Sequence, residues 1–359
     1  DNMMGKGVLV AEADVNSYEV LNYHVLEGIA DWVRVVNRDG IIIYANKSMK
    51  EELGEEIIGI PCDESHCGLN NCTFCITKRS MQTGEVIQKE EKIDGNYYSV
   101  KSSPVKNSNG DIYAAVEVFR DVTRERNLER DLIGKNKKIN RDLQFAKRIQ
   151  EKILPKKGVS ESVKLDYIYK PSEILSGDMF DMFNIDEENI GIYISDVSGK
   201  GIAASMMTMF IRQSMRVMKD DIKSPSAALT ELHKRFISLN LEPDSYFTMF
   251  YGIYNRNNHS FKYVNAGHNC IPIRFNDNDL DLLYNKGYPI TSLFEKINYI
   301  EKSIQLDIGD KIFFYTDGIT EARDSSGKEF GLEEVIKIIK ECKEKILNVI
   351  EDKIINHSW

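Results

Sequence analysis

The stretch GIYISDVSGKG at residues 191–201 decides the fold of the second half of this chain. Its apolar residues predict a buried strand, and that strand ends on the carboxylate of Asp196. Gly199 and Gly201 follow, and glycines let a backbone approach a ligand closely. A carboxylate beside a buried strand is unfavourable unless it is paired or binds a metal ion. Asp196 is therefore the first candidate metal ligand.

Two other stretches share this design. The sequence IFFYTDG at residues 312–318 is an apolar strand that ends on Asp317, and SGD at residues 176–178 places Asp178 at the mouth of the next strand. A turn or cap residue would explain any one of these aspartates alone. Together, without His or Cys, they indicate a hard cation such as Mg²⁺ or Mn²⁺.

The pattern around these aspartates predicts an α+β domain over residues 158–359. Hairpin signals at residues 188–189 and 257–258 favour antiparallel pairing of its strands. We expect helices at 202–218, at 227–239 and from 332 onward, and strands at 164–170, 179–185, 190–197, 246–254, 261–265, 271–275 and 311–316.

The first part of the chain predicts a smaller antiparallel sheet with helices on one side. Asp39-Gly40 and Asp94-Gly95 are hairpin signals between apolar runs, and Asn46 is a good N-cap for a short helix. We expect strands at 33–37, 41–45, 86–93, 96–102 and 112–120. This domain is predicted to cover residues 23–121, after an N-terminal segment at 1–22.

A long polar helix is predicted from Asp121 to Leu154, where Pro155 stops it, and residues 122–157 are the expected linker. Apolar residues recur every seven positions, as in the seam of a coiled coil. Two seam positions are instead Lys135 and Asp142. A single solvated connector helix would explain the segment, but the repeat favours a parallel dimeric linker and hence a homodimer.

Four strings resemble the metal-dependent protein phosphatase (PPM, type 2C-like) superfamily in its bacterial sporulation and stress-response branch. They are SGDMFD at 176–181, DVSGKG at 196–201, NAGH at 265–268 and YTDGITEA at 315–322, and the similarity covers residues 145–357. The resemblance implies an α/β/β/α sandwich with two Mn²⁺ or Mg²⁺ ions. Their ligands, which are also the catalytic residues, would be Asp178, Asp196 and Asp317, with the carbonyl of Val197 as a further metal ligand. We expect His268 to structure its loop rather than to catalyse.

The resemblance also implies a function. The ions of this superfamily activate a water molecule that attacks phosphorus in line. The implied protein is a serine/threonine phosphatase, and its substrate and partner is a phosphorylated anti-sigma factor antagonist of the STAS type. The family ends with an Asp-Asp-x-Thr strand that this chain does not reach before Trp359. Either the chain stops short of its natural end, or it is a degenerate phosphatase that acts as a phosphoprotein-binding scaffold.

Residues 33–46 and 112–123 resemble a PAS sensor domain. Between them lie Cys62, Cys67, Cys72 and Cys75. Four thiolates this close in sequence could bind zinc or an iron–sulfur cluster. Reduced, partly buried thiols or a redox pair without metal would also explain them, and we favour this simpler interpretation.

Composition excludes several classes of protein. The net charge of −9 and the absence of a dense basic patch argue against a nucleic-acid partner. No apolar run approaches the roughly 18 residues of a membrane helix, so no membrane partner is expected. The cysteine usage is that of a reducing compartment, and a cytoplasmic protein is predicted.

Overall fold

A computed structural model describes residues 23–65, 75–160, 163–218, 221–342 and 345–357. The predicted segment 1–22 lies outside these residues. The chain forms two compact units, residues 1–138 and 139–359, and each is considered by itself. No helix in the described ranges is both long and apolar enough to cross a membrane.

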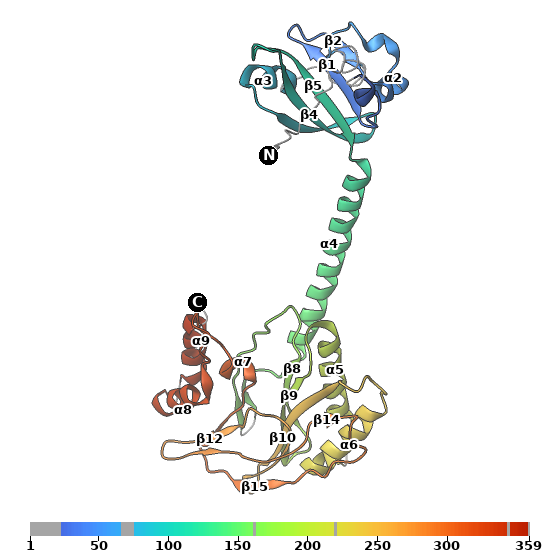
Figure 1. The fold of residues 1–359 in the computed structure, drawn as a ribbon. Coiled ribbons are helices and arrows are strands. Elements are labelled where there is room, and N and C mark those ends of the chain that lie inside the picture. The colour runs from blue at the N-terminus through green and yellow to red at the C-terminus, as the bar shows by residue number, and fades with distance from the viewer. Residues whose placement is uncertain (1–22, 66–74, 161–162, 219–220, 343–344, 358–359) are drawn as a thin grey trace, which may run out of the picture. The chain divides into compact units, whose positions relative to one another are not determined.

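The N-terminal unit contains the expected antiparallel sheet with helices (Figure 1). Its strand order is β2-β1-β5-β4-β3, and the helices α2, η1 and α3 cover the apolar core face. The turn residues Asp94 and Gly95 both have positive φ, as a tight hairpin requires. The strands are β1 (Trp32–Asn37), β2 (Ile42–Ala45), β3 (Ile87–Ile93), β4 (Asn96–Lys106) and β5 (Ile112–Asp121), and the helices are α2 (Lys47–Leu53), η1 (Glu55–Ile57) and α3 (Ile76–Thr83).

A buried ion pair lies on the core face of this sheet. Arg34 and Glu117 pair in register on β1 and β5, and their side chains join at 2.7 Å. The hydroxyl of Ser65 accepts a hydrogen bond from Arg34, and that of Thr77 donates one to Glu117. These partners satisfy two charges that would otherwise be costly to bury.

Helix α4 (Thr123–Lys152) follows β5, and the Asp121 side chain accepts a hydrogen bond from the Thr123 amide at its start. This helix agrees with the predicted long polar helix. Only Gln150 in α4 is buried, whereas apolar residues of the predicted seam such as Leu128, Leu132 and Ile139 are exposed.

The C-terminal unit has four layers (Figure 1). Helices α5 and α6 pack on one face of a six-stranded sheet, whose other face packs against a three-stranded sheet. Helices α8 and α9 cover the outer face of the smaller sheet. This order is the α/β/β/α sandwich expected from the sequence.

The larger sheet has the order β15-β11-β10-β9-β8, with β14 paired to β10, and the smaller sheet has the order β13-β12-β16. Helices are α5 (Gly201–Val217), η2 (Asp221–Lys223), α6 (Pro225–Ile237), α7 (Asp317–Thr320), α8 (Gly331–Glu341) and α9 (Ile346–His357). Strands are β6 (Gly158–Ser160), β7 (Val163–Leu165), β8 (Asp178–Asn184), β9 (Asn189–Val197), β10 (Tyr246–Asn255), β11 (Ser260–Ala266), β12 (Ile273–Phe275), β13 (Leu280–Leu282), β14 (Ile290–Thr291), β15 (Lys302–Gln305) and β16 (Lys311–Phe313).

One predicted strand is largely wrong. Of residues 164–170, only the first two belong to a strand, the short β7 that pairs with β6. Tyr167 and Tyr169 instead place their rings against Phe180 of β8, with centroids 4.8 and 6.3 Å away. Most of this segment therefore contributes side-chain packing against β8 and not a backbone ladder.

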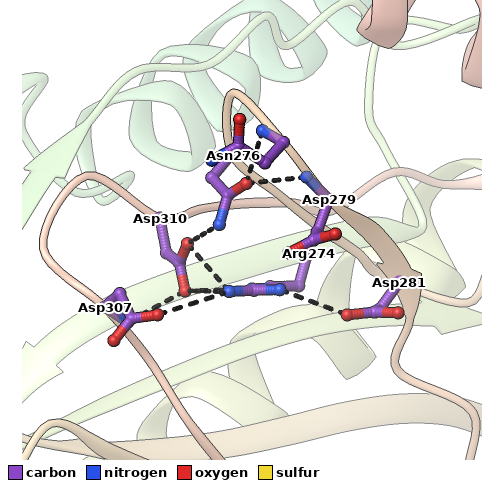
Figure 2. Close-up of polar contacts among 7 residues, drawn as sticks. Arg274, Asn276, Asp279, Asp281, Asp307 and Asp310 are labelled. Carbon is purple, nitrogen blue, oxygen red and sulfur yellow. Dashed lines mark hydrogen bonds and ion pairs between the residues drawn. The ribbon is translucent and has the colours of Figure 1, made fainter.

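A polar cluster fixes one end of the smaller sheet (Figure 2). Arg274 of β12 makes a bidentate contact with Asp310, in which Nε donates to Oδ2 at 2.9 Å and Nη2 donates to Oδ1 at 3.1 Å, and it also reaches Asp281 of β13. Asn276 donates to the same Asp310 carboxylate at 2.8 Å. The turn before β16 is thereby tied to both of the other strands.

Candidate metal centre

The register of one hairpin brings two of the predicted aspartates together. Strands β8 and β9 pair antiparallel, and Asp178 lies directly opposite Asp196. Side chains opposite each other on neighbouring strands lie within contact distance of one another. Two residues that are 18 positions apart in sequence thus meet at one edge of the larger sheet.

The third aspartate arrives from the smaller sheet. Strand β16 ends at Phe313, three residues earlier than expected, and the chain then turns into α7, which begins at Asp317. The preceding residue, Thr316, donates its hydroxyl to the Asp178 carboxylate at 2.9 Å. This contact joins the two sheets at the site and brings Asp317 beside Asp178.

These carboxylates repel one another. Burial raises the pKa of Asp178, and the nearby Asp317 raises it further, although the Thr316 hydroxyl opposes the change. Burial also raises the pKa of Asp196 to about 7, with added repulsion from Asp178 and Asp317. A cluster of this kind is stabilised by protons or by cations.

Two other buried carboxylates provide a contrast, because arginines already neutralise them. Asp181 lies on the opposite face of β8 and accepts two hydrogen bonds of 2.8 Å from Arg216 of α5. Burial would raise the pKa of Asp310, but hydrogen bonds from the Asp307 amide, Asn276 and Arg274 lower it below its usual value. In the described parts of the chain, no Lys or Arg forms an ion pair with any aspartate of the candidate centre.

The backbone around the centre is closely packed. A Cβ atom on Gly177 would lie 3.2 Å from the Val197 carbonyl oxygen and 3.3 Å from the Ala204 side chain. The Val197 amide donates to the Gly177 carbonyl at 3.2 Å. Glycine at this position therefore lets the segment before β8 lie directly on the end of β9, where Val197 was predicted to offer its carbonyl.

His268 joins three segments next to the aspartates. Its backbone amide donates to the Asn265 side chain at 2.7 Å, and its ring lies 3.2 Å from both the Thr248 hydroxyl and the Tyr315 carbonyl. Burial lowers its pKa, so the ring is neutral near pH 7. These contacts are those of a loop-structuring residue, as expected from the sequence.

The donor set fits a hard divalent cation. Carboxylate and carbonyl oxygens are the ligands that Mg²⁺ and Mn²⁺ prefer. No three His, Cys, Asp or Glu side chains among the residues described are arranged as a complete metal site. Ions of this class keep several water ligands and use few carboxylates, so an open carboxylate cluster is compatible with them.

The comparisons with known proteins agree with this geometry. The family described as "Stage II sporulation protein E (SpoIIE)" matches residues 186–358, which include Asp196 and Asp317 but begin after Asp178. A PAS domain matches residues 30–124. The C-terminal unit is therefore similar to the SpoIIE family, and the N-terminal unit is similar to a PAS domain.

Two curated relatives are similar to about half of this chain. The chain is 31% identical to the phosphoserine phosphatase RsbU of Bacillus subtilis over 198 residues, which are 55% of this chain and 58% of RsbU. It is 30% identical over 182 residues to the phosphoserine phosphatase RsbP of the same organism, covering 50% of this chain and 45% of RsbP. The chain thus spans about half the length of these relatives.

A solved structure supports the fold alone. The SiaA-PP2C domain of Pseudomonas aeruginosa superposes with a TM-score of 0.53 at 18% identity, covering 62% of this chain and 92% of that domain. The C-terminal unit therefore shares its sandwich fold with that domain.

Two further side chains of the C-terminal unit lie near the aspartates. The acidic side chain of Glu321, one turn beyond Asp317, adds to the negative potential that raises the pKa of Asp196. Burial, followed by repulsion from the three aspartates, raises the pKa of the Cys270 thiol to about 12. Cys270 thus stays protonated beside the cluster, where its buried side chain packs in the core.

The cysteine site predicted in the PAS domain is only partly visible. Cys67 and Cys72 lie outside the described residues, and Cys62 and Cys75 are free thiols. Cys75 is the N-cap of α3, and its sulfur accepts a hydrogen bond from the Lys78 amide at 3.4 Å. Burial raises the pKa of Cys62 to about 11, although Arg34 opposes the change. Metal or cluster binding by the four cysteines stays a prediction.

Proposed function

We propose that this chain is a metal-dependent protein serine/threonine phosphatase of the bacterial cytoplasm. Its substrate would be a phosphoserine or phosphothreonine on an anti-sigma factor antagonist of the STAS type. The observation that carries the proposal is the pairing of Asp178 with Asp196 beside Asp317, without an arginine or lysine partner in the described residues. Homology to two phosphoserine phosphatases supports the same reaction.

We infer that Asp178, Asp196, Asp317 and the Val197 carbonyl hold two Mn²⁺ or Mg²⁺ ions. When bound, such ions polarise a phosphoryl group and lower the pKa of water. The protein itself contributes the placement of the ligands: Thr316 orients Asp178, and the Val197–Gly177 hydrogen bond holds the two strand ends together. A cleft of about 2330 Å³ is lined by all three aspartates and is open to a protein substrate.

The test is dephosphorylation of a phosphorylated antagonist protein with and without Mn²⁺. Release of phosphate that requires Mn²⁺ and fails in Asp317→Asn would support the proposal. Stable binding of the phosphoprotein without turnover would instead support the degenerate scaffold. Phosphate release that survives a chelator would exclude the metal mechanism.

We further propose that the PAS domain regulates this activity through α4, and that α4 forms a parallel homodimer. The seam residues Leu128, Leu132 and Ile139 are more than half exposed in the single chain, and pairing with a second copy would bury them. Analytical ultracentrifugation of Leu132→Asp tests this, because pairing would bury two like charges at the seam. Ile133→Asp is the matched control, because Ile133 is also exposed but lies off the seam. Dissociation in the first variant alone would support the dimer, and equal masses would exclude it.

A further inference from the structure

Gln150 is a buried polar residue on a helix that is otherwise exposed. Its side chain is 2% exposed and lies in the last turn of α4, within the C-terminal unit. Burying an amide is unfavourable unless its donors and acceptor find partners. The hydrogen-bond partners of the Gln150 side chain therefore indicate its role.

The Gln150 amide pairs with both backbone groups of one residue. Its nitrogen donates to the Ser176 carbonyl at 2.8 Å, and its oxygen accepts from the Ser176 amide at 3.0 Å. The same nitrogen lies 3.2 Å from the Thr208 hydroxyl of α5, which itself donates to the Ser205 carbonyl. A reversed amide would place its nitrogen against the Ser176 amide, which is also a donor, and its oxygen against the Ser176 carbonyl, which is also an acceptor. Only one orientation of the Gln150 amide is therefore compatible with these contacts.

Ser176 leads directly to the candidate metal centre. Its hydroxyl accepts a hydrogen bond from the Asp178 amide at 3.0 Å. The intervening Gly177 accepts one from Val197, whose carbonyl is a proposed ligand. Gly177 is also pressed against Ala204 of α5, so a displaced segment has little room to settle elsewhere. Gln150 is thus connected to Asp178 by two successive hydrogen bonds, both of which involve Ser176.

We propose that Gln150 is a positioning residue for the metal centre and that it makes the place of Asp178 depend on the last turn of α4. This inference rests on the proposed function and names the residue through which α4 acts on the site. Neighbours that orient metal ligands typically change metal affinity by about 10- to 100-fold when they are removed. Gln150 acts one residue further out, through the backbone, and the lower end of that range is expected.

The experiment measures Mn²⁺ binding to the full chain by calorimetry, independently of turnover. Gln150→Leu keeps the approximate volume but leaves the Ser176 amide and carbonyl without their partner, and Ser176 is only 7% exposed. We expect its dissociation constant for Mn²⁺ to rise by about 10-fold. Phosphatase activity should fall at limiting Mn²⁺ and recover at saturating Mn²⁺. Amide hydrogen exchange at Asp178 and Val197 should accelerate even without metal.

Two further variants separate positioning from general stability. Gln144→Leu makes the same change at an exposed position of α4 and should leave Mn²⁺ affinity unchanged. Thr208→Val removes one acceptor from Gln150 and should weaken Mn²⁺ binding by about 2- to 10-fold, the equivalent of one hydrogen bond. Thr208→Val also keeps the inference testable if Gln150→Leu does not fold.

The outcomes are distinct. Equal Mn²⁺ affinity in the wild type and in a folded Gln150→Leu protein, with unchanged exchange at Asp178, would overturn this inference and leave the proposed function intact. A lower melting temperature with unchanged Mn²⁺ affinity would assign Gln150 a structural role only and would overturn it equally. A wild type that binds no Mn²⁺ would overturn the proposed function together with this inference.

Discussion

Replacing Asp196 by asparagine should have opposite effects on stability and on activity. Because Asp196 is repelled by Asp178 and Asp317, removal of its charge should stabilise the metal-free protein. The same change removes a charged ligand from the proposed ions, so Mn²⁺-dependent phosphatase activity should be lost. An aspartate that merely capped a turn would show neither effect.

The structure sets the size of the stabilisation. The pKa of Asp196 is raised from 3.8 to about 7, and a rise of that size corresponds to about 4 kcal/mol. Asp196 is partly exposed, and we halve this value to about 2 kcal/mol to allow for solvent screening. For a unit of this length, that free energy raises the melting temperature by about 4 to 8 °C.

Thermal unfolding in the presence of a chelator checks this prediction. Since the folded-state pKa is raised, the penalty of the wild-type carboxylate is absent below about pH 4, grows as the pH rises and is complete above about pH 7. The advantage of Asp196→Asn should follow the same course. Asp186→Asn is a control, because hydrogen bonds from Glu188 and Asn189 lower the pKa of Asp186 against the opposing effect of burial. This control should lose stability.

The reasoning would be refuted by a lower melting temperature of metal-free Asp196→Asn at pH 7.5. Near-wild-type turnover of this variant at saturating Mn²⁺ would refute the assignment of the site.

Three further predictions concern the rest of the chain. Inserting two residues after Gly134 rotates the far end of α4 by about 200°, and the phosphatase activity should change or lose its dependence on the PAS domain. A seven-residue insertion nearly restores the helical phase and should be tolerated. Unchanged regulation in the two-residue variant would make α4 a passive tether. Arg34→Met leaves the buried Glu117 without its cation and should destabilise the PAS domain by about 3–5 kcal/mol in urea unfolding followed by tryptophan fluorescence; a loss below about 1 kcal/mol would contradict this. Asp310→Asn should cost about 2 kcal/mol at pH 7, because Arg274 loses its bidentate partner. Since the pKa of folded Asp310 is lowered, the difference should stay constant down to about pH 4, shrink as the pH falls further and vanish only below that lowered pKa; a difference that stays constant on further acidification would disprove the ion-pair explanation.

Local signals in the sequence predicted the elements with strong patterns. Alternating residues and Asp-Gly turns located the strands of the PAS domain, and Asn46 was correctly placed as an N-cap. The short edge strands β13, β14 and β15 were missed. Strand β15, for example, reads KSIQ and has mostly exposed side chains, so it carries no burial pattern to detect.

The sequence predicted candidate ligands where the signal lies within a single strand, and it missed partners that come from distant segments. Because successive side chains of a strand alternate between its faces, Asp178 and Asp181 must point to opposite sides of β8. The arginine that neutralises Asp181 comes from α5, 35 residues later, and no local signal announces it. Gln150 and Gln144 are likewise indistinguishable in sequence, since only tertiary contacts bury one of them.

Because Asp178 and Asp196 lie opposite each other, the candidate metal centre forms only when β8 and β9 pair in this register. A slip of one residue between β8 and β9 would turn Asp178 towards α5 and carry the apolar side chains of β8 to the wrong face of the sheet. A misregistered molecule would therefore lose its core together with its metal ligands. The pairing of β8 with β9 thus makes the assembly of the metal ligands and the stability of the core depend on the same register.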